Sequence, residues 1–282
     1  AALDATKLTL AANASVMMTA EQNNAFTGTI TATGAEKITL SNAANATGLD
    51  SIETYVLANG AQTFTLGDAS QNVTTGTGAV VISTGAVADI TDAALDGSNA
   101  NTLKVIVGAD TDISDAVITG TGGAQDAAYT IDIAENADAI TMTIAQNALI
   151  DAVTDGGDAV ITLSDAGAAT GDAGISKYVL ANAGGTTFTL GATGQNVDTG
   201  GAGDIIDVAG LIATGVFNTV STDTIKLSTG ANIASVQGEG GAAGAALDAT
   251  KLTLAVNASV TMTAAQNNAF TGTITATGAE KI

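Results

Sequence analysis

The stretch AALDATKLTLAANASVMMTAEQNNAFTGTITATGAEKI, Ala1–Ile38, returns almost letter for letter as Ala245–Ile282. The two copies differ at three positions, which are Ala12 and Val256, Met17 and Thr261, and Glu21 and Ala265. A return at a fixed offset is typical of a tandem array. The sequence therefore predicts that residues 1–244 are one repeat unit and that residues 245–282 begin the next copy.

A weaker repeat lies inside this unit. Segments of the first half recur about 124 residues later, Ile38–Ser41 as Ile161–Ser164, Tyr55–Asn59 as Tyr178–Asn182 and Thr63–Gly67 as Thr187–Gly191. The repeat unit is therefore expected to consist of two diverged half-repeats, at about residues 1–123 and 124–244.

Short runs that alternate apolar and small polar residues follow one another along the chain and are separated by Gly, Asn or Asp. Such alternation predicts half-buried strands, as at Ile38 and Leu40 or at Phe64 and Leu66. Two all-β architectures fit. An elongated β-solenoid, similar to a parallel β-helix, stacks small inward residues in columns. Tandem β-sandwich domains are the alternative, but they usually need longer strands and larger core residues.

Three segments break the alternation and carry a helix-start signal. Thr19–Gln22, Thr143–Gln146 and Thr263–Gln266 each place a threonine three residues before a glutamine. This is the capping box, in which the two side chains satisfy free main-chain amides at a helix start. We therefore expect occasional short helices of about two turns.

Composition excludes several classes of function. The 282 residues have a net charge of −21, no His, no Cys and no Trp, and all seven basic residues are Lys. This charge repels nucleic acid and anionic membranes, and no apolar run is long enough to span a bilayer. The commonest catalytic base and the usual sugar-binding aromatics are scarce or missing, and Asp155 and Asp158 form the nearest carboxylate pair. The chain is not expected to be an enzyme, to bind nucleic acid or to insert into a membrane.

Acidic residues gather in the middle of the chain, where eighteen of the twenty-eight lie between Asp89 and Asp207. Three clusters are Asp89, Asp92 and Asp96; Asp110, Asp112 and Asp115; and Asp151, Asp155 and Asp158. Calcium prefers carboxylate and turn carbonyl oxygens, which Asp-rich turns supply. We expect calcium at Asp110, Asp112 and Asp115, and first at Asp110 and Asp112, beside which Gly108 allows a tight turn. A solvated acidic surface is the alternative.

The segment Gly200–Val208, GGAGDIIDV, resembles the Gly-rich nonapeptide of RTX proteins, the calcium-binding repeats of secreted bacterial surface proteins. The resemblance implies calcium near Asp204 and Asp207, although Ile205 stands where the family usually has Asp. The composition of the whole chain, which is rich in Thr, Ala, Gly and Asp, is similar to that of S-layer and RTX-like adhesin repeats. That resemblance implies a location outside the cell, at the bacterial surface.

Two further patterns have competing interpretations. Threonine pairs such as Thr63 and Thr65 place hydroxyls on one strand face, which fits an ice- or glycan-binding surface or simply β-propensity. Four Asn-x-Ser/Thr sequences, at Asn13, Asn45, Asn72 and Asn257, fit N-glycosylation acceptors. Asparagine ladders that link stacked turns are the interpretation we favour.

The leading functional hypothesis is a non-catalytic structural subunit of a self-assembling bacterial surface structure: an S-layer, a filament or a tubular appendage. Open strands at the unit ends, Leu8–Leu10 and Leu252–Leu254, are expected to pair with further copies of the chain. Cell-surface polysaccharide is a second expected partner. The competing hypothesis is a monomeric stalk in a secreted RTX-like adhesin.

Overall fold

The chain forms a parallel β-solenoid of about 12 turns with three short helices. This computed structural model describes residues 6–282 except 92, 98–99, 101, 109, 120–129, 135–138, 155–158 and 239. The chain divides into two compact units, the first comprising residues 1–137 and 149–154 and the second residues 138–148 and 155–282. Among the described residues of each unit the strand pairings are parallel, so the sandwich alternative, which needs antiparallel sheets, is wrong.

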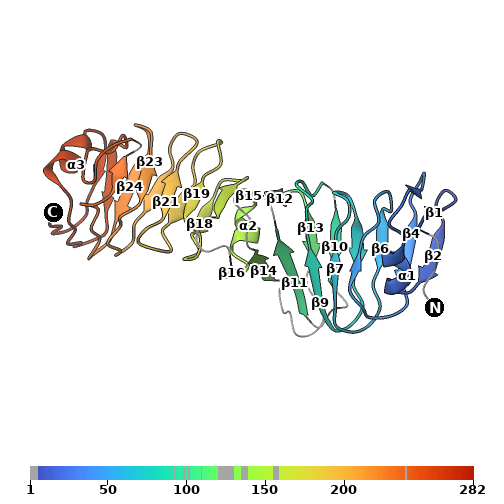
Figure 1. The fold of residues 1–282 in the computed structure, drawn as a ribbon. Coiled ribbons are helices and arrows are strands. Elements are labelled where there is room, and N and C mark those ends of the chain that lie inside the picture. The colour runs from blue at the N-terminus through green and yellow to red at the C-terminus, as the bar shows by residue number, and fades with distance from the viewer. Residues whose placement is uncertain are drawn as a thin grey trace. The chain divides into compact units, whose positions relative to one another are not determined.

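In the first unit, strands from successive turns of the chain lie next to one another and form parallel sheets (Figure 1). A two-stranded sheet pairs β1 (Leu8–Thr9) with β3 (Ile30–Thr31). A six-stranded sheet runs through β2 (Ser15–Met18), β4 (Lys37–Leu40), β6 (Thr54–Val56), β8 (Asn72–Thr74), β10 (Ala94–Asp96) and β13 (Val117–Thr119). A second six-stranded sheet runs through β5 (Ala46–Thr47), β7 (Gln62–Thr65), β9 (Ala79–Ser83), β11 (Thr102–Val107), β14 (Thr130–Ile133) and β16 (Ile150–Val153). The short strand β12 (Thr111–Asp112) also lies in this unit.

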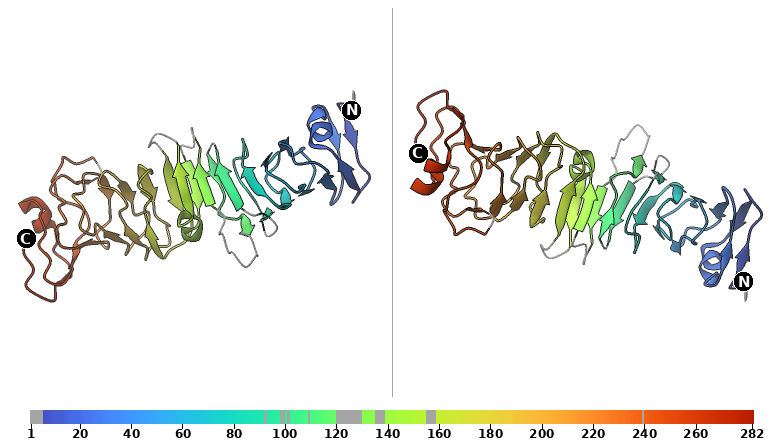
Figure 2. Two further views of the ribbon diagram at one scale, coloured as in Figure 1. Left: turned by 90° about the horizontal axis from the view of Figure 1, so that it is seen from below. Right: turned by 90° about the horizontal axis from the view of Figure 1, so that it is seen from above.

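The second unit repeats this plan, and its strands follow one another in chain order in both views of Figure 2. One sheet runs through β15 (Ala139–Met142), β17 (Val160–Leu163), β19 (Lys177–Val179), β21 (Asn196–Asp198), β23 (Val216–Asn218) and β25 (Gln237–Gly238). The other runs through β18 (Ala168–Thr170), β20 (Thr187–Thr189), β22 (Ile205–Asp207), β24 (Thr224–Leu227), β26 (Lys251–Leu254) and β27 (Ile274–Thr275).

The core consists of the inward residues that the alternation predicted. Ile38 and Leu40 are buried while Thr39 between them is half-exposed, and the pattern recurs in β17 and β24. Parallel in-register pairing places equivalent residues of successive turns on top of one another, for example Ile38 beside Tyr55. The inward side chains therefore stack in continuous apolar columns.

The three expected helices are present, and each begins with the expected capping box. They are α1 (Ala20–Ala25), α2 (Ile144–Asn147) and α3 (Ala264–Ala269). In each helix the N-cap threonine accepts a hydrogen bond from the glutamine main chain, and the glutamine side chain accepts one from the threonine N–H.

The two units share a buried polar lock between helix and strand. Tyr55 donates its hydroxyl proton to Asn23 Oδ1 at 3.2 Å and accepts from the N–H of Leu49 at 2.8 Å. Tyr178 likewise donates to Asn147 Oδ1 at 3.0 Å and accepts from Asp172 N–H at 2.8 Å. Each pair of bonds fixes a short helix against the next turn of the solenoid.

A buried glutamine makes a second shared lock. Gln195 donates to the carbonyls of Asp172 and Ile175, and its Oε1 accepts from Gly191 N–H at 2.7 Å. Gln71 makes the corresponding bonds to Leu49, Ile52 and Gly67. These shared contacts accord with an internal duplication, while the boundaries of the repeat unit stay a prediction from the sequence.

Candidate functional site

Two fully buried aspartates form the most unusual group of side chains in the second unit. Asp204 precedes β22 and Asp223 precedes β24, and both have no solvent exposure. Asp223 Oδ1 accepts from the main-chain N–H groups of Gly203 and Asp204, each at 3.0 Å. Its Oδ2 accepts from Thr199 Oγ1 at 2.7 Å and from Val220 N–H at 2.8 Å. Four donors therefore satisfy both carboxylate oxygens of Asp223.

Asp204 lacks such compensation. Its Oδ1 accepts from Thr186 N–H at 2.7 Å, but its Oδ2 is buried without a hydrogen-bond partner, and so is the hydroxyl of Thr186. Burial raises the pKa of the Asp204 carboxyl above its usual range, and the charge of Asp223 adds to this rise. Main-chain donors of Thr186, Gly185 and Gly201 oppose the rise without cancelling it. The carboxyl of Asp204 is therefore harder to ionise than that of an exposed aspartate.

The first unit has aliphatic residues at the corresponding places. Thr65 pairs with Ser83 as Thr189 pairs with Asp207, so Val80 occupies the position of Asp204. Val80 and its neighbour in the next turn, Leu103, are both buried. The carboxylates of the second unit therefore replace an apolar column that is sufficient to hold the same fold.

Asp207, which the RTX resemblance grouped with Asp204, forms an ion pair. Its Oδ2 lies 2.7 Å from Lys226 Nζ in the adjacent strand, and its Oδ1 accepts from Ala209 N–H at 2.9 Å. Asp204 is fully buried and Asp207 is engaged with a lysine. Sequence reasoning missed Asp223, although it is an acid in the residue just before a strand, where the alternation expects an inward apolar side chain.

The remaining expected calcium ligands belong to the first unit, where Asp112 ends β12 and Asp110 and Asp115 lie just outside that strand. Asp112 Oδ1 accepts from the main-chain N–H and the hydroxyl of Ser114, at 2.9 and 2.7 Å. Asp110 and Asp115 are exposed, and Asp89 forms an isolated bridge with Asp112. In the part of the chain that the structure describes, no three acidic side chains are grouped closely enough to hold a metal ion.

The other acidic clusters are only partly within the described residues. Asp96 accepts a hydrogen bond from Thr119 at 3.3 Å, and Asp151 is exposed. Asp92, Asp155 and Asp158 lie outside the described residues. Calcium binding therefore stays a prediction from the sequence.

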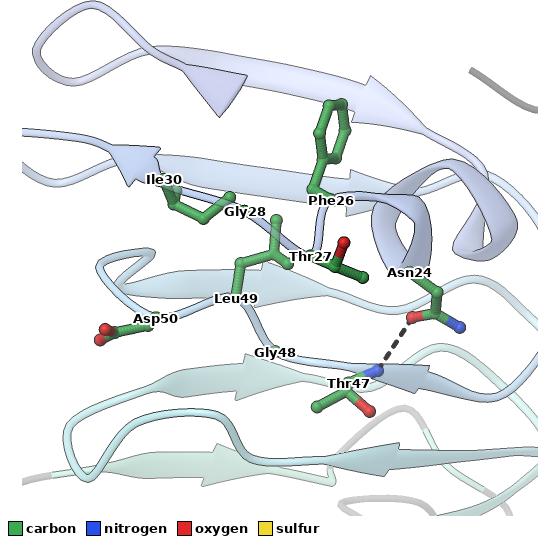
Figure 3. Close-up of a pocket in the computed structure, with 9 residues that line it drawn as sticks. All are labelled: Asn24, Phe26, Thr27, Gly28, Ile30, Thr47, Gly48, Leu49 and Asp50. Carbon is green, nitrogen blue, oxygen red and sulfur yellow. Dashed lines mark hydrogen bonds between the residues drawn. The ribbon is translucent and has the colours of Figure 1, made fainter. Parts of the chain in front are cut away.

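A pocket of about 330 Å³ lies in the first unit beside α1 (Figure 3). Its lining residues are Asn24, Phe26, Thr27, Gly28, Ile30, Thr47, Gly48, Leu49 and Asp50. Asn24 Oδ1 accepts from Thr47 N–H at 3.2 Å and so is already used to link two turns. This volume is at the low end of small-molecule sites, and the side chains carry no group suited to catalysis beyond the single carboxylate of Asp50.

A smaller groove of about 240 Å³ lies in the second unit, over β19, β21 and β23. It presents Lys177, Asn196, Asp198 and Asn218 together with two valines. Lys177 Nζ lies 3.7 Å from Asp198 Oδ2. Charged and amide groups on a rigid sheet can hydrogen-bond to sugar hydroxyls.

Asparagine side chains link successive turns, although not as the stacked asparagine ladder that the sequence suggested. In each case Oδ1 accepts a main-chain N–H of the next turn, and the pairs are Asn13 and Ala35, Asn45 and Thr63, Asn59 and Thr77, Asn72 and Ala94, Asn196 and Val216, and Asn257 and Ala279. The residues of all four glycosylation-like sequences thus have a structural role.

No protein-family model, curated protein or solved structure matches this chain. The described residues contain no helix with the length and apolar character needed to cross a bilayer. The fold class is an all-β parallel solenoid, and a fold class does not by itself imply a function.

Proposed function

We propose that the chain is a repeat segment of a non-catalytic structural protein in a bacterial extracellular assembly, such as an S-layer, a filament or a tubular appendage. The observation that carries the proposal is the junction between the repeat unit and its next copy. There β24 pairs in register with β26, the first strand of the second copy, through Thr224–Leu227 and Lys251–Leu254. Tandem copies join by the same main-chain pairing that holds each copy together.

This junction gives the repeat a mechanical role. Each turn contacts only its neighbours, so stability accumulates along an array and each added copy lengthens it. Buried side-chain bonds between turns, such as those of Gln195 and Tyr178, reinforce the main-chain ladder. A chain built in this way resists extension without needing disulfides, for which it has no cysteine.

A monomeric adhesin stalk is the second candidate, and one observation favours it. The large apolar side chains exposed among the described residues lie at separate positions in the sequence, no two of them in the same strand, and they are Met17, Val117, Ile212, Val220, Val256, Ile274 and Ile282. Lateral protein contacts usually bury a contiguous apolar surface. A stalk needs the end-to-end junction but no lateral contact.

Calcium and polysaccharide are proposed partners. With a net charge of −21, side-by-side association of copies needs cations to reduce repulsion, and exposed acids such as Asp115 can attract them. The groove over β19, β21 and β23 is the place we propose for polysaccharide.

Electron microscopy of the purified 282-residue chain, with millimolar calcium and with a chelator, tests these proposals. Ordered polymers that dissolve on chelation are expected if calcium bridges copies. Polymers that persist with the chelator retain the structural function and remove calcium from it. Isolated particles in both conditions contradict self-assembly and favour the stalk.

A further inference from the structure

The main-chain ladder of the first unit is interrupted beside α1. β3 pairs with β1, whereas β5 begins the sheet that continues through β7. Among the described residues β3 and β5 do not pair with each other, although β5 follows β3 by one turn of the solenoid. The pocket of about 330 Å³ lies in this interruption and is lined by residues from both sides of it (Figure 3).

Asparagine side chains of α1 take the place of a strand along the edge of β5. Asn23 Nδ2 donates to the carbonyl of Thr47 at 2.7 Å, and Asn24 Oδ1 accepts from the N–H of Thr47 at 3.2 Å. Asn24 Nδ2 donates to the carbonyl of Asn45 at 3.0 Å. These bonds hold the helix against β5 and engage both ends of the Asn24 amide. The hydrogen bonds of a ligand therefore fall to other lining residues.

The floor of the pocket is apolar. Phe26 and Leu49 each have 8% of their surface exposed, and Ile30 is half-buried. Phe26 and Ile30 come from the segment that follows α1, and Leu49 comes from the segment that follows β5. A floor of this kind favours the carbon chain of a ligand over a hydrated ion.

The rim of the pocket is polar and exposed. It consists of Thr27, Thr47 and Asp50. In the view of Figure 3, Asp50 lies at one end of the lining residues and the two threonines lie toward the other end. Asp50 takes no part in the three ion pairs of the described residues. One carboxylate and two hydroxyls supply too few oxygens for calcium.

The charge of the chain indicates the charge of the ligand. With a net charge of −21, the protein attracts cations and repels anions. A primary ammonium has three N–H donors and no acceptor. It therefore matches a rim that offers a carboxylate at one end and hydroxyl oxygens at the other, while a short aliphatic chain matches the floor.

We propose that this pocket binds a short aliphatic diamine. One ammonium contacts the carboxylate of Asp50, the carbon chain lies over Ile30 and Leu49, and the second ammonium donates to the hydroxyls of Thr27 and Thr47. This binding site goes beyond the proposed structural function and does not depend on self-assembly.

The helix side of the pocket recurs in the second copy of the repeat. Its five lining residues are unchanged there, and they are Asn268, Phe270, Thr271, Gly272 and Ile274. The three positions at which the copies differ lie outside the lining. An array of such repeats therefore carries this part of the site once in each copy.

Isothermal titration calorimetry of the 282-residue chain with the diamine putrescine tests the site. Butanediol, which has the same carbon chain without charge, is the matched ligand. We expect putrescine to bind saturably and about fivefold more tightly than butanediol, the scale of one exposed ion pair. The amide resonances of Thr47 and Asp50 should shift with the same affinity.

Three variants separate the charge from the apolar floor. Asp50→Asn keeps the side-chain shape and should weaken putrescine about fivefold while leaving butanediol unchanged. Asp115→Asn, at an exposed acid of the same unit outside the lining, should leave both affinities unchanged. Ile30→Ala removes part of the floor and should weaken both ligands by a similar factor, about threefold.

Each contrary result overturns the site. Equal affinities for putrescine and butanediol, or wild-type affinity of Asp50→Asn for putrescine, remove the contact between ammonium and carboxylate. Equal weakening by Asp115→Asn shows that putrescine responds only to the overall charge. Absence of saturable heat and of resonance shifts at Thr47 and Asp50, up to about 100 mM putrescine, excludes binding altogether. None of these results bears on polymers seen in the electron microscope, so the proposed function is tested separately.

Discussion

The main-chain N–H of Asp204 donates a hydrogen bond to Oδ1 of Asp223 at 3.0 Å, so two buried acids from successive turns are held side by side. Asp223 is satisfied by four donors, whereas one oxygen of Asp204 has no partner. The other charged groups on the neighbouring strands, Asp207 and Lys226, pair with each other. β20, on the other side of β22, has no titratable side chain.

This arrangement predicts that the second unit loses stability as pH rises. The pKa of Asp204 is raised in the folded chain, so its contribution is fully present below the unfolded value of about 3.9 and is lost as pH rises through the folded pKa. Asp204→Asn, which cannot ionise, should flatten this dependence. Melting temperatures of both proteins from acid to alkaline pH check it, and parallel curves would contradict it.

Calcium provides an independent check on the same residue. If calcium raises the melting temperature of the wild-type chain and not that of Asp204→Asn, the carboxylate binds a cation rather than a proton, as the RTX resemblance implied. An equal rise in melting temperature for the two proteins would show that calcium does not act through the Asp204 carboxylate.

Tyr178→Phe should destabilise the second unit by about 1–3 kcal/mol, because it leaves Asn147 Oδ1 and the N–H of Asp172 without their buried partner. Tyr55→Phe should have the same effect on the first unit. Hydrogen exchange resolved by residue measures the two effects separately. Equal loss of protection in both units from either substitution would show that the locks are not local.

Gly191→Ala should lower the free energy of unfolding by about 3 kcal/mol. A Cβ at this position would lie 1.8 Å from the carbonyl oxygen of Gly171 in the neighbouring turn. Gly194→Ala, three residues further on, is the matched control because a Cβ there meets no atom within 4 Å. Urea denaturation compares them. Similar midpoints for the two variants would mean that the turns do not approach as closely as described.

Glu36 predicts the opposite pH dependence in the first unit. Burial raises the pKa of the Glu36 carboxyl. Hydrogen bonds from the main-chain N–H groups of Gly34, Thr33 and Asn13 together lower this pKa by more than burial raises it, so the net shift is downward. Its stabilising contribution is present above the unfolded pKa and is lost as pH falls through the folded one. The amide resonance of Gly34 should titrate with a midpoint below the usual glutamate range. A midpoint at or above that range would contradict the net shift.

Much of the fold was predictable because it depends on local patterns. Alternation identified buried residues such as Ile38, Leu40 and Phe64, and the capping boxes located all three helices. The acidic site was less predictable. Asp204 stood out in the sequence because of its glycine-rich turn, but Asp223, near 20 residues away, had no motif of its own and entered the site only through stacking.

The sequence by itself determined the repeat, the short strands and the small inward side chains, since each depends on residues close together in the chain or on direct comparison of its segments. Only the tertiary structure decided that the pairing is parallel, that Asp204 and Asp223 share a column, and that Asp207 is neutralised by Lys226. The physical reason is register. Which side chains meet across successive turns depends on the length of each turn, and an alternating pattern specifies only whether a residue faces inward or outward.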